Sequence, residues 1–133
     1  MQKDTYIFPC VFIYKDEGIS IYFPDLDGCI SYGEDEKDAL LSAKEALSLH
    51  LYGMEQDNDV IPEPRQLRVL KIDTDEKAVL IEVFMPAYRA KKANKYVKKT
   101  LTIPQWLNIE AERQGVNFSQ ILQNGLKEYL HIN

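Results

Sequence analysis

The sequence predicts an α+β protein with a β-β-β-α-β domain in residues 1–85 and a strand-helix-helix module in residues 97–133, joined by a basic linker in residues 86–96. Three observations support this prediction. Apolar alternation typical of strands opens the chain, a self-contained pattern of one strand and two helices closes it, and the net charge changes sign between the two parts. With 133 residues, 45% of them hydrophobic, the chain is long enough to bury a core.

Three strands are expected at the N-terminus. Residues 5–14 are almost all β-branched or aromatic, and residues 19–23 alternate between more and less apolar side chains. Gly18 closes the hairpin between them, because glycine adopts positive φ without steric cost. A third short strand is expected in residues 30–32, after the turn formed by residues 24–29.

One helix of about 16 residues is expected after the third strand. Apolar residues recur at spacings of three and four between Ala39 and Leu51. Asp35 is the expected N-cap and Gly53 the expected C′ residue, since a short polar side chain and a glycine suit these two positions.

The first domain is expected to end in extended segments. An acidic loop with two prolines leads to residues 67–72 and 78–85, which are rich in apolar and β-branched side chains and flank a turn at residues 73–77. The second of these segments supplies the final strand of the domain, and the first is a candidate for an additional strand.

The last 37 residues contain one short strand and two helices. Residues 97–103 alternate as a strand, Pro104 suits the first position of a helix, and Gly115 ends that helix. Asn117 is the expected N-cap of the second helix, with Gln120 in the matching N3 position. A unit this small leaves one apolar face uncovered, so we expect it to dimerise. The residues expected in the dimer core are Leu101, Ile103, Ile121 and Leu122.

The net charge of −5 is distributed unevenly along the chain. Residues 1–84 carry 8 lysine and arginine residues against 18 aspartate and glutamate residues, a net charge of −10. Residues 85–133 carry 8 against 3, a net charge of +5. The two parts therefore suit partners of opposite charge, a cationic protein and a nucleic acid; the alternative is an ordinary solvated surface.

The C-terminal strand predicts a DNA-binding ribbon. Lys98, Thr100 and Thr102 share one of its faces, and the apolar residues share the other. If two copies pair antiparallel, the polar face fits the major groove, where these three side chains would read bases. The alternative is a plain dimerisation module. The residues whose backbone N–H groups would bind a DNA phosphate at the start of the second helix are Asn117, Phe118 and Ser119.

No residue pattern supports catalysis. His50 and His131 have no serine, cysteine or paired carboxylate at a suggestive spacing. Cys10 and Cys29 are expected to be small buried hydrophobic residues rather than a disulfide or half of a metal site. A Mg²⁺-dependent nuclease is the enzymatic alternative, because carboxylates cluster in residues 25–38, but helix capping and solvation account for these side chains. We therefore expect no enzyme activity, no metal and no cofactor.

No membrane segment is expected. The sequence has no apolar run near the roughly 18 residues of a membrane span and no leader-like apolar segment after Met1. These features predict a cytoplasmic protein that does not bind membranes.

Two groups of motifs resemble known families. The N-terminal part resembles the HicB antitoxin family in Phe23-Pro24-Asp25-Leu26-x-Gly28-Cys29, Gly33-Glu34, Ala39-Leu40 and Ile61-Pro62-x-Pro64, where x marks a position that does not carry the resemblance. The C-terminal part is similar to ribbon-helix-helix DNA-binding domains in Leu101-Thr102-Ile103-Pro104, Trp106-Leu107, Ala111 and Gly115-Val116-Asn117-Phe118-Ser119. The order and spacing of the motifs make the combination specific.

The resemblance implies an antitoxin with two functions. Its N-terminal domain would have a partial, non-catalytic RNase H-like fold and would neutralise a small basic HicA-type toxin that cleaves mRNA. Its ribbon-helix-helix domain would form a homodimer, or a higher even-numbered oligomer, and would repress its own operon by binding operator DNA. The alternative is a stand-alone ribbon-helix-helix repressor with a ligand-sensing N-terminal domain. The acidic residues expected to contact the toxin are Asp25, Asp27, Glu34, Glu36, Asp57 and Asp59.

Overall fold

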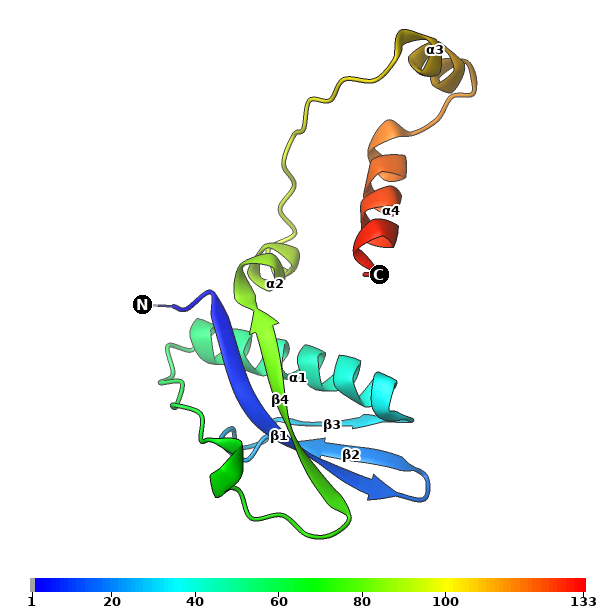
Figure 1. Cartoon of the computed structure of the whole chain (residues 1–133). Helices are drawn as coiled ribbons and strands as arrows, with labels where there is room; N and C mark the ends of the chain where they lie inside the picture. Colours follow the sequence, from blue (N-terminus) through cyan, green and yellow to red (C-terminus); the bar gives the residue numbers. More distant parts are fainter. Residues whose placement is uncertain (1) are drawn as a thin grey trace. The chain divides into compact units, whose positions relative to one another are not determined.

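The chain, which the computed structural model describes for residues 2–133, divides into two compact units between Lys95 and Tyr96. The first unit contains a four-stranded antiparallel sheet. Its strands are β1 (Thr5–Lys15), β2 (Gly18–Tyr22), β3 (Ile30–Gly33) and β4 (Glu76–Phe84). Their order is β3-β2-β1-β4, so β1 lies between β2 and β4 (Figure 1). The α+β class and the predicted strands at both ends of this unit are confirmed.

Helix α1 (Glu36–Gln56) lies against one face of the sheet (Figure 1). Alternate side chains of β1 point toward α1 and pack against its buried apolar residues, which recur at every fourth position along the helix. Gly33 allows the close approach of β3 to the start of α1, because a Cβ at this position would collide with the backbone of Ala39. The buried residues of this contact are Tyr6, Phe8, Cys10 and Phe12 from β1 and Ala39, Ala43, Leu47 and Leu51 from α1.

The start of α1 is as predicted, but its end is not. The Asp35 carboxylate accepts a hydrogen bond of 2.8 Å from the backbone N–H of Asp38, which confirms the N-cap. The prediction that Gly53 ends the helix is wrong, because the helix continues to Gln56 and has 21 residues. The additional turn places the Glu55 carboxylate in an ion pair with Arg89 at 2.6 Å, and Asn58 after the helix adopts the left-handed conformation, with φ of 57°.

Residues 67–72, our candidate for an additional strand, do not form one in the described chain. A short 3₁₀ helix, η1 (Leu67–Val69), lies there instead, and no strand of the sheet pairs with it. Both edges next to β1 are already taken by β2 and β4, so this segment could pair only at an outer edge of the sheet.

Helix α2 (Met85–Lys92) occupies most of the segment that we expected to be a linker. Pro86 is tolerated in the first turn, where its missing N–H costs no helical hydrogen bond. Met85 is fully buried, and its backbone N–H donates a 2.7 Å hydrogen bond to the carbonyl oxygen of Asp4. These contacts attach α2 to the first unit, so that only the residues after Lys92 run without regular structure toward the second unit.

The second unit contains α3 (Gln105–Arg113) and α4 (Phe118–Leu130). Pro104 lies at the N-cap of α3, one position before the predicted one, and Gly115 follows its C-cap with φ of 66° as predicted. The Asn117 side chain caps α4 by accepting from the N–H of Gln120 at 3.0 Å. The reciprocal half of the capping box is not found in residues 2–133, and the Gln120 side-chain amide donates to the Asn124 side chain.

Residues 97–103, expected to be a strand, have no regular secondary structure in the described chain. A strand is stabilised by hydrogen bonds to a neighbour, and a single copy offers this segment none. The ribbon proposed from the sequence would supply that neighbour from a second copy.

Candidate functional site

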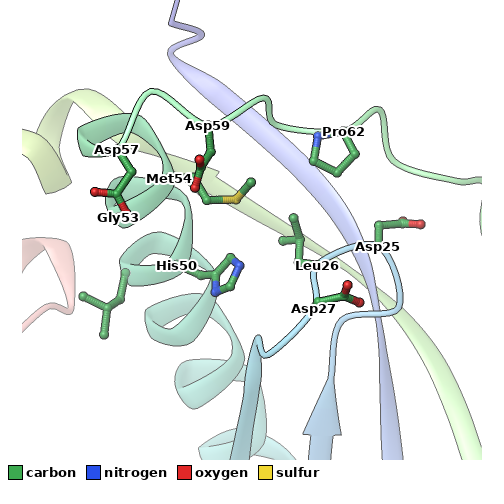
Figure 2. A pocket seen from close by; sticks show the side chains of 10 residues that line it. Asp25, Leu26, Asp27, His50, Gly53, Met54, Asp57, Asp59 and Pro62 are labelled. Carbon is green, nitrogen blue, oxygen red and sulfur yellow. The ribbon is translucent and has the colours of Figure 1, made fainter.

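An acidic pocket lies at the C-terminal end of α1 (Figure 2). It has a volume of about 530 Å³. Figure 2 shows the His50 imidazole projecting from α1 toward the loop that carries Asp27, with Asp57 and Asp59 above it on the segment that follows the helix. The remaining lining residues are Asp25, Leu26, Leu49, Gly53, Met54 and Pro62. The pocket thus brings together four of the six carboxylates expected to contact a toxin.

The four carboxylates of the pocket are not equivalent. Asp25 has a structural role, because its carboxylate accepts from Nε of Arg65 at 2.6 Å and from the Arg65 backbone N–H at 3.1 Å. Its side chain is only 7% exposed. Asp27, Asp57 and Asp59 are exposed and take part in none of the ion pairs found in residues 2–133. Three carboxylates therefore remain free to meet a cation.

The other two expected residues, Glu34 and Glu36, lie at the opposite end of α1. Glu36 accepts a 2.6 Å hydrogen bond from the hydroxyl of Tyr14, and this bond raises the pKa of Tyr14. The backbone N–H of Glu34 donates to the side chain of Asp38 at 2.8 Å. Because a helix rises 1.5 Å per residue, the two ends of α1 are roughly 30 Å apart, and the six carboxylates form two separate groups.

A partly buried ion pair that the sequence did not indicate joins α1 to α2. The Arg89 guanidinium contacts the Glu55 carboxylate at 2.6 Å, and it also donates to the carbonyl oxygen of Lys3 at 2.7 Å. The Glu55 side chain is only 2% exposed. The hydrogen bond to Glu55 raises the pKa of Arg89. In the sequence, Arg89 is one of six cations in a basic run, and nothing there marks its partner 34 residues away.

The two cysteines are buried and unpaired, as expected. Burial raises the pKa of the Cys10 thiol to about 12 and that of the Cys29 thiol to about 11. Among the described residues, no group of three histidine, cysteine, aspartate or glutamate side chains is placed to hold a metal ion. None of the helices in residues 2–133 combines the length and apolar character needed to span a bilayer.

The residues expected to bind DNA and to form the dimer core lie in the second unit. Lys98, Thr100 and Thr102 are exposed on the irregular segment before α3. The side chain of Asn117 is engaged in capping, whereas Phe118 and Ser119 begin α4. Of the expected dimer-core residues, Leu101, Ile103 and Ile121 are exposed and Leu122 is half-buried. No described residue of this unit is buried, so a single copy does not enclose a core.

The fold and these surfaces define a class of protein: an α+β chain in which an acidic sheet domain precedes a basic segment and a pair of helices. The model of the HicB-like antitoxins of bacterial toxin-antitoxin systems matches residues 8–123. The chain therefore belongs to the HicB-like antitoxin family. This is a family of antitoxins, which in general are not enzymes.

Individual proteins match the chain at low sequence identity. An uncharacterized 14.9 kDa protein from the rep-hol intergenic region of Haemophilus phage HP1 (strain HP1c1) is 26% identical over 119 residues, which cover 77% of this chain and 87% of the phage protein. A crystal structure of the antitoxin HicB3 is 28% identical with a TM-score of 0.51 and covers 93% of this chain and 97% of that one.

Two further solved structures share the fold. A toxin-antitoxin complex from Streptococcus pneumoniae contains a chain that is 23% identical, with a TM-score of 0.60 and coverage of 94% of this chain and 99% of that one. The antitoxin HicB of Burkholderia pseudomallei is 18% identical, with a TM-score of 0.54 and coverage of 94% and 98%. The similarity extends over both units of the chain.

Proposed function

We propose that this antitoxin neutralises a small, basic HicA-type toxin that cleaves mRNA and represses its own operon through its C-terminal unit. The observation that carries the proposal is the contrast in charge between the units of a chain that belongs to an antitoxin family. An acidic unit attracts a cationic ribonuclease, and a basic segment attracts DNA. The chain from Streptococcus pneumoniae, which has a similar fold, is described as part of a toxin-antitoxin complex.

The first unit is the toxin-binding part of this proposal. Its three-stranded meander followed by a helix and a fourth strand is the arrangement we interpret as a partial, non-catalytic RNase H-like fold. Inhibition by such a domain would act by covering the active site or the RNA-binding surface of the toxin. The five exposed carboxylates among the six, at the two ends of α1, would increase the rate of association with a cationic partner.

The second unit is the DNA-binding part. Its exposed apolar residues and its Schellman-type turn between two capped helices fit a ribbon-helix-helix module that is completed by a second copy. Pairing of residues 97–103 from two copies would present Lys98, Thr100 and Thr102 to the major groove. The two N–H groups at the start of α4, from Phe118 and Ser119, would bind a phosphate.

Co-expression with the small HicA-type gene that accompanies the antitoxin gene tests the proposal. We expect the antitoxin to rescue growth, to co-purify with the toxin and to protect a fragment of the DNA upstream of the operon. Operator binding without rescue or co-purification would contradict the toxin-binding role and favour a stand-alone repressor. Rescue without DNA protection would contradict the repressor role.

A further inference from the structure

We propose that the toxin docks on the solvent-facing ridge of α1 and in the acidic pocket at its C-terminal end, with an arginine or lysine side chain of the toxin among Asp27, Asp57 and Asp59. The inference rests on the proposed toxin-binding function and assigns it to one of the two acidic groups. We define the docking surface as Leu41, Leu49 and Gly53 on α1 together with these three aspartates.

The electrostatics of α1 distinguish its two ends. The C-terminus of a helix carries a partial negative charge, which cations in the last turn stabilise and carboxylates destabilise. The last turn of α1 has no basic residue, and Asp57 and Asp59 follow directly. Glu55 is the single carboxylate of this turn that has a cation, because Arg89 holds it on the inner side. On the solvent-facing side of this helix end, Asp27, Asp57 and Asp59 are in none of the ion pairs found in residues 2–133, so a cation from a partner would stabilise them.

The N-terminal end of α1 has the opposite character. A helix N-terminus carries a partial positive charge, and the carboxylates of Asp35, Glu36 and Asp38 stabilise it. Asp35 and Asp38 also accept hydrogen bonds from backbone N–H groups. The acidic residues at the N-terminal end of α1 therefore stabilise the isolated protein. The acidic residues at the C-terminal end do not, so their presence there needs another explanation.

A ridge that carries two exposed leucines leads into the pocket. Leu41, the exposed Glu45, Leu49 and Gly53 are spaced by four residues and therefore follow one another along the side of α1. Leu41 is 60% exposed and Leu49 is 53% exposed, and Leu49 and Gly53 also line the pocket. Because exposed ion pairs contribute little affinity, a stable complex needs apolar contacts beside the charges. The ridge supplies these contacts next to the carboxylates, which suits a cationic partner with an apolar surface.

The open space at Gly53 permits a direct test. A Cβ at this position has no atom within 4 Å, so a side chain can be added without a collision inside the chain. Gly53→Arg places a cation in the last turn of α1 and fills part of the pocket. We expect this variant to unfold at a higher temperature than the original protein and to bind the toxin at least about tenfold more weakly.

Two matched pairs of substitutions locate the binding charge. Asp57→Asn with Asp59→Asn removes two charges from the pocket, and Glu34→Gln with Glu36→Gln removes two charges from the other end of the helix. With a catalytically inactive HicA-type toxin as the probe and the full chain as the antitoxin, we expect the pocket pair to raise the Kd about tenfold with no loss of thermal stability. The control pair should change the Kd less than about twofold and lower the Tm, since it removes favourable charges from a helix N-terminus.

The results separate the inference from the proposed function on which it rests. If the unsubstituted chain does not bind the toxin, both the docking surface and the proposed antitoxin function are wrong. If it binds, but the pocket pair and the control pair weaken binding equally or not at all, the docking surface is wrong and the antitoxin function stands. Leu80→Asp tests the opposite face of the sheet, where Leu80 and Phe84 are exposed on β4. Loss of toxin binding in this variant, together with normal binding by the Asp57→Asn, Asp59→Asn protein, would show that the toxin binds the opposite face of the sheet and would overturn the inference.

Discussion

The two units of this chain differ in whether they enclose a core. In the first, Phe8, Leu47 and Met85 are fully buried between the sheet and its helices. In the second, no described residue is buried, and Leu101 and Ile121 are 57% and 55% exposed. The first unit is thus stabilised by its own contacts, whereas the second leaves apolar surface exposed, which in our proposal a second copy covers. We therefore expect the stability of the second unit, but not that of the first, to depend on protein concentration.

The largest effect is expected from breaking the second unit. Leu101→Asp with Ile121→Asp places charges on the surface that two copies would share, and burial of unpaired charges is strongly unfavourable. We expect a monomer whose affinity for the operator falls about 1,000-fold, to the level of non-specific binding. Sedimentation velocity and gel-shift titration measure the two properties. A dimer that persists in this variant would show that the copies associate elsewhere.

The next effect concerns the anchoring of α2 to the first unit. Arg89→Ala leaves the Glu55 carboxylate buried without its cation, and we expect a loss of about 3 kcal/mol in the free energy of unfolding. Replacing both residues, Arg89→Met with Glu55→Met, should recover most of this loss because no unpaired charge remains. Urea denaturation of the full chain measures both changes, and equal losses in the single and double variants would contradict the role of the ion pair.

The same anchoring predicts where the first unit ends. A fragment of residues 1–95 should fold and bind the toxin, whereas a fragment of residues 1–84 lacks Met85 and Arg89 and should be markedly less stable. Loss of a fully buried methionine alone costs about 2–5 kcal/mol when it is replaced by alanine. Circular dichroism melting of the two fragments compares them, and identical melting temperatures would show that α2 is dispensable.

A smaller effect separates base reading from phosphate attraction in the second unit. Thr100→Ala with Thr102→Ala should reduce the preference for operator over random DNA by about 1–3 kcal/mol for each base that is no longer read. Lys98→Ala should weaken binding to both kinds of DNA and lower the salt slope by about one unit, because a complex with one neutralised phosphate fewer also releases one counterion fewer. Binding titrations at several salt concentrations distinguish the two. An unchanged operator preference in the double threonine variant would exclude these side chains from base reading.

The effect that is smallest near neutral pH, where it vanishes, concerns the cysteines of the first unit. Their folded-state pKa values of about 12 and about 11 exceed the ordinary value of 9.0. Because the thiols keep their protons more tightly when folded, their contribution to stability is complete below pH 9 and is lost as the pH rises toward 11–12. Cys10→Ala with Cys29→Ala should flatten this alkaline loss. Urea unfolding between pH 8 and pH 10.5 measures it, and equal slopes in both proteins would contradict the assignment.

Features that depend on local sequence were predicted correctly. The strands of the meander, the N-caps at Asp35 and Asn117 and the left-handed Gly115 follow from periodicity and from the chemistry of neighbouring backbone groups. Features that depend on distant partners were not. Helix α2 is attached through Glu55, which lies 34 residues before Arg89, and the turn that extends α1 past Gly53 is joined to it by the same ion pair.

The candidate site shows the same division. The sequence identified the acidic residues but not their separation into two groups, because this separation depends on the length of α1 and on the return of the chain toward the loop at Asp27. The role of Asp25 also depends on a distant partner, since Arg65 lies 40 residues further along the chain. Residues 97–103 have no regular structure in the described chain, because a strand there would need a neighbouring strand, which we propose comes from a second copy.

Native mass spectrometry of the full chain mixed with an inactive HicA-type toxin tests most directly the claim that the two units have separate partners. We predict an even-numbered assembly of the original antitoxin with bound toxin. For the Leu101→Asp, Ile121→Asp variant, we predict one antitoxin chain that still binds toxin. A variant that becomes monomeric and loses the toxin would contradict the claim, because toxin binding would then require the second unit.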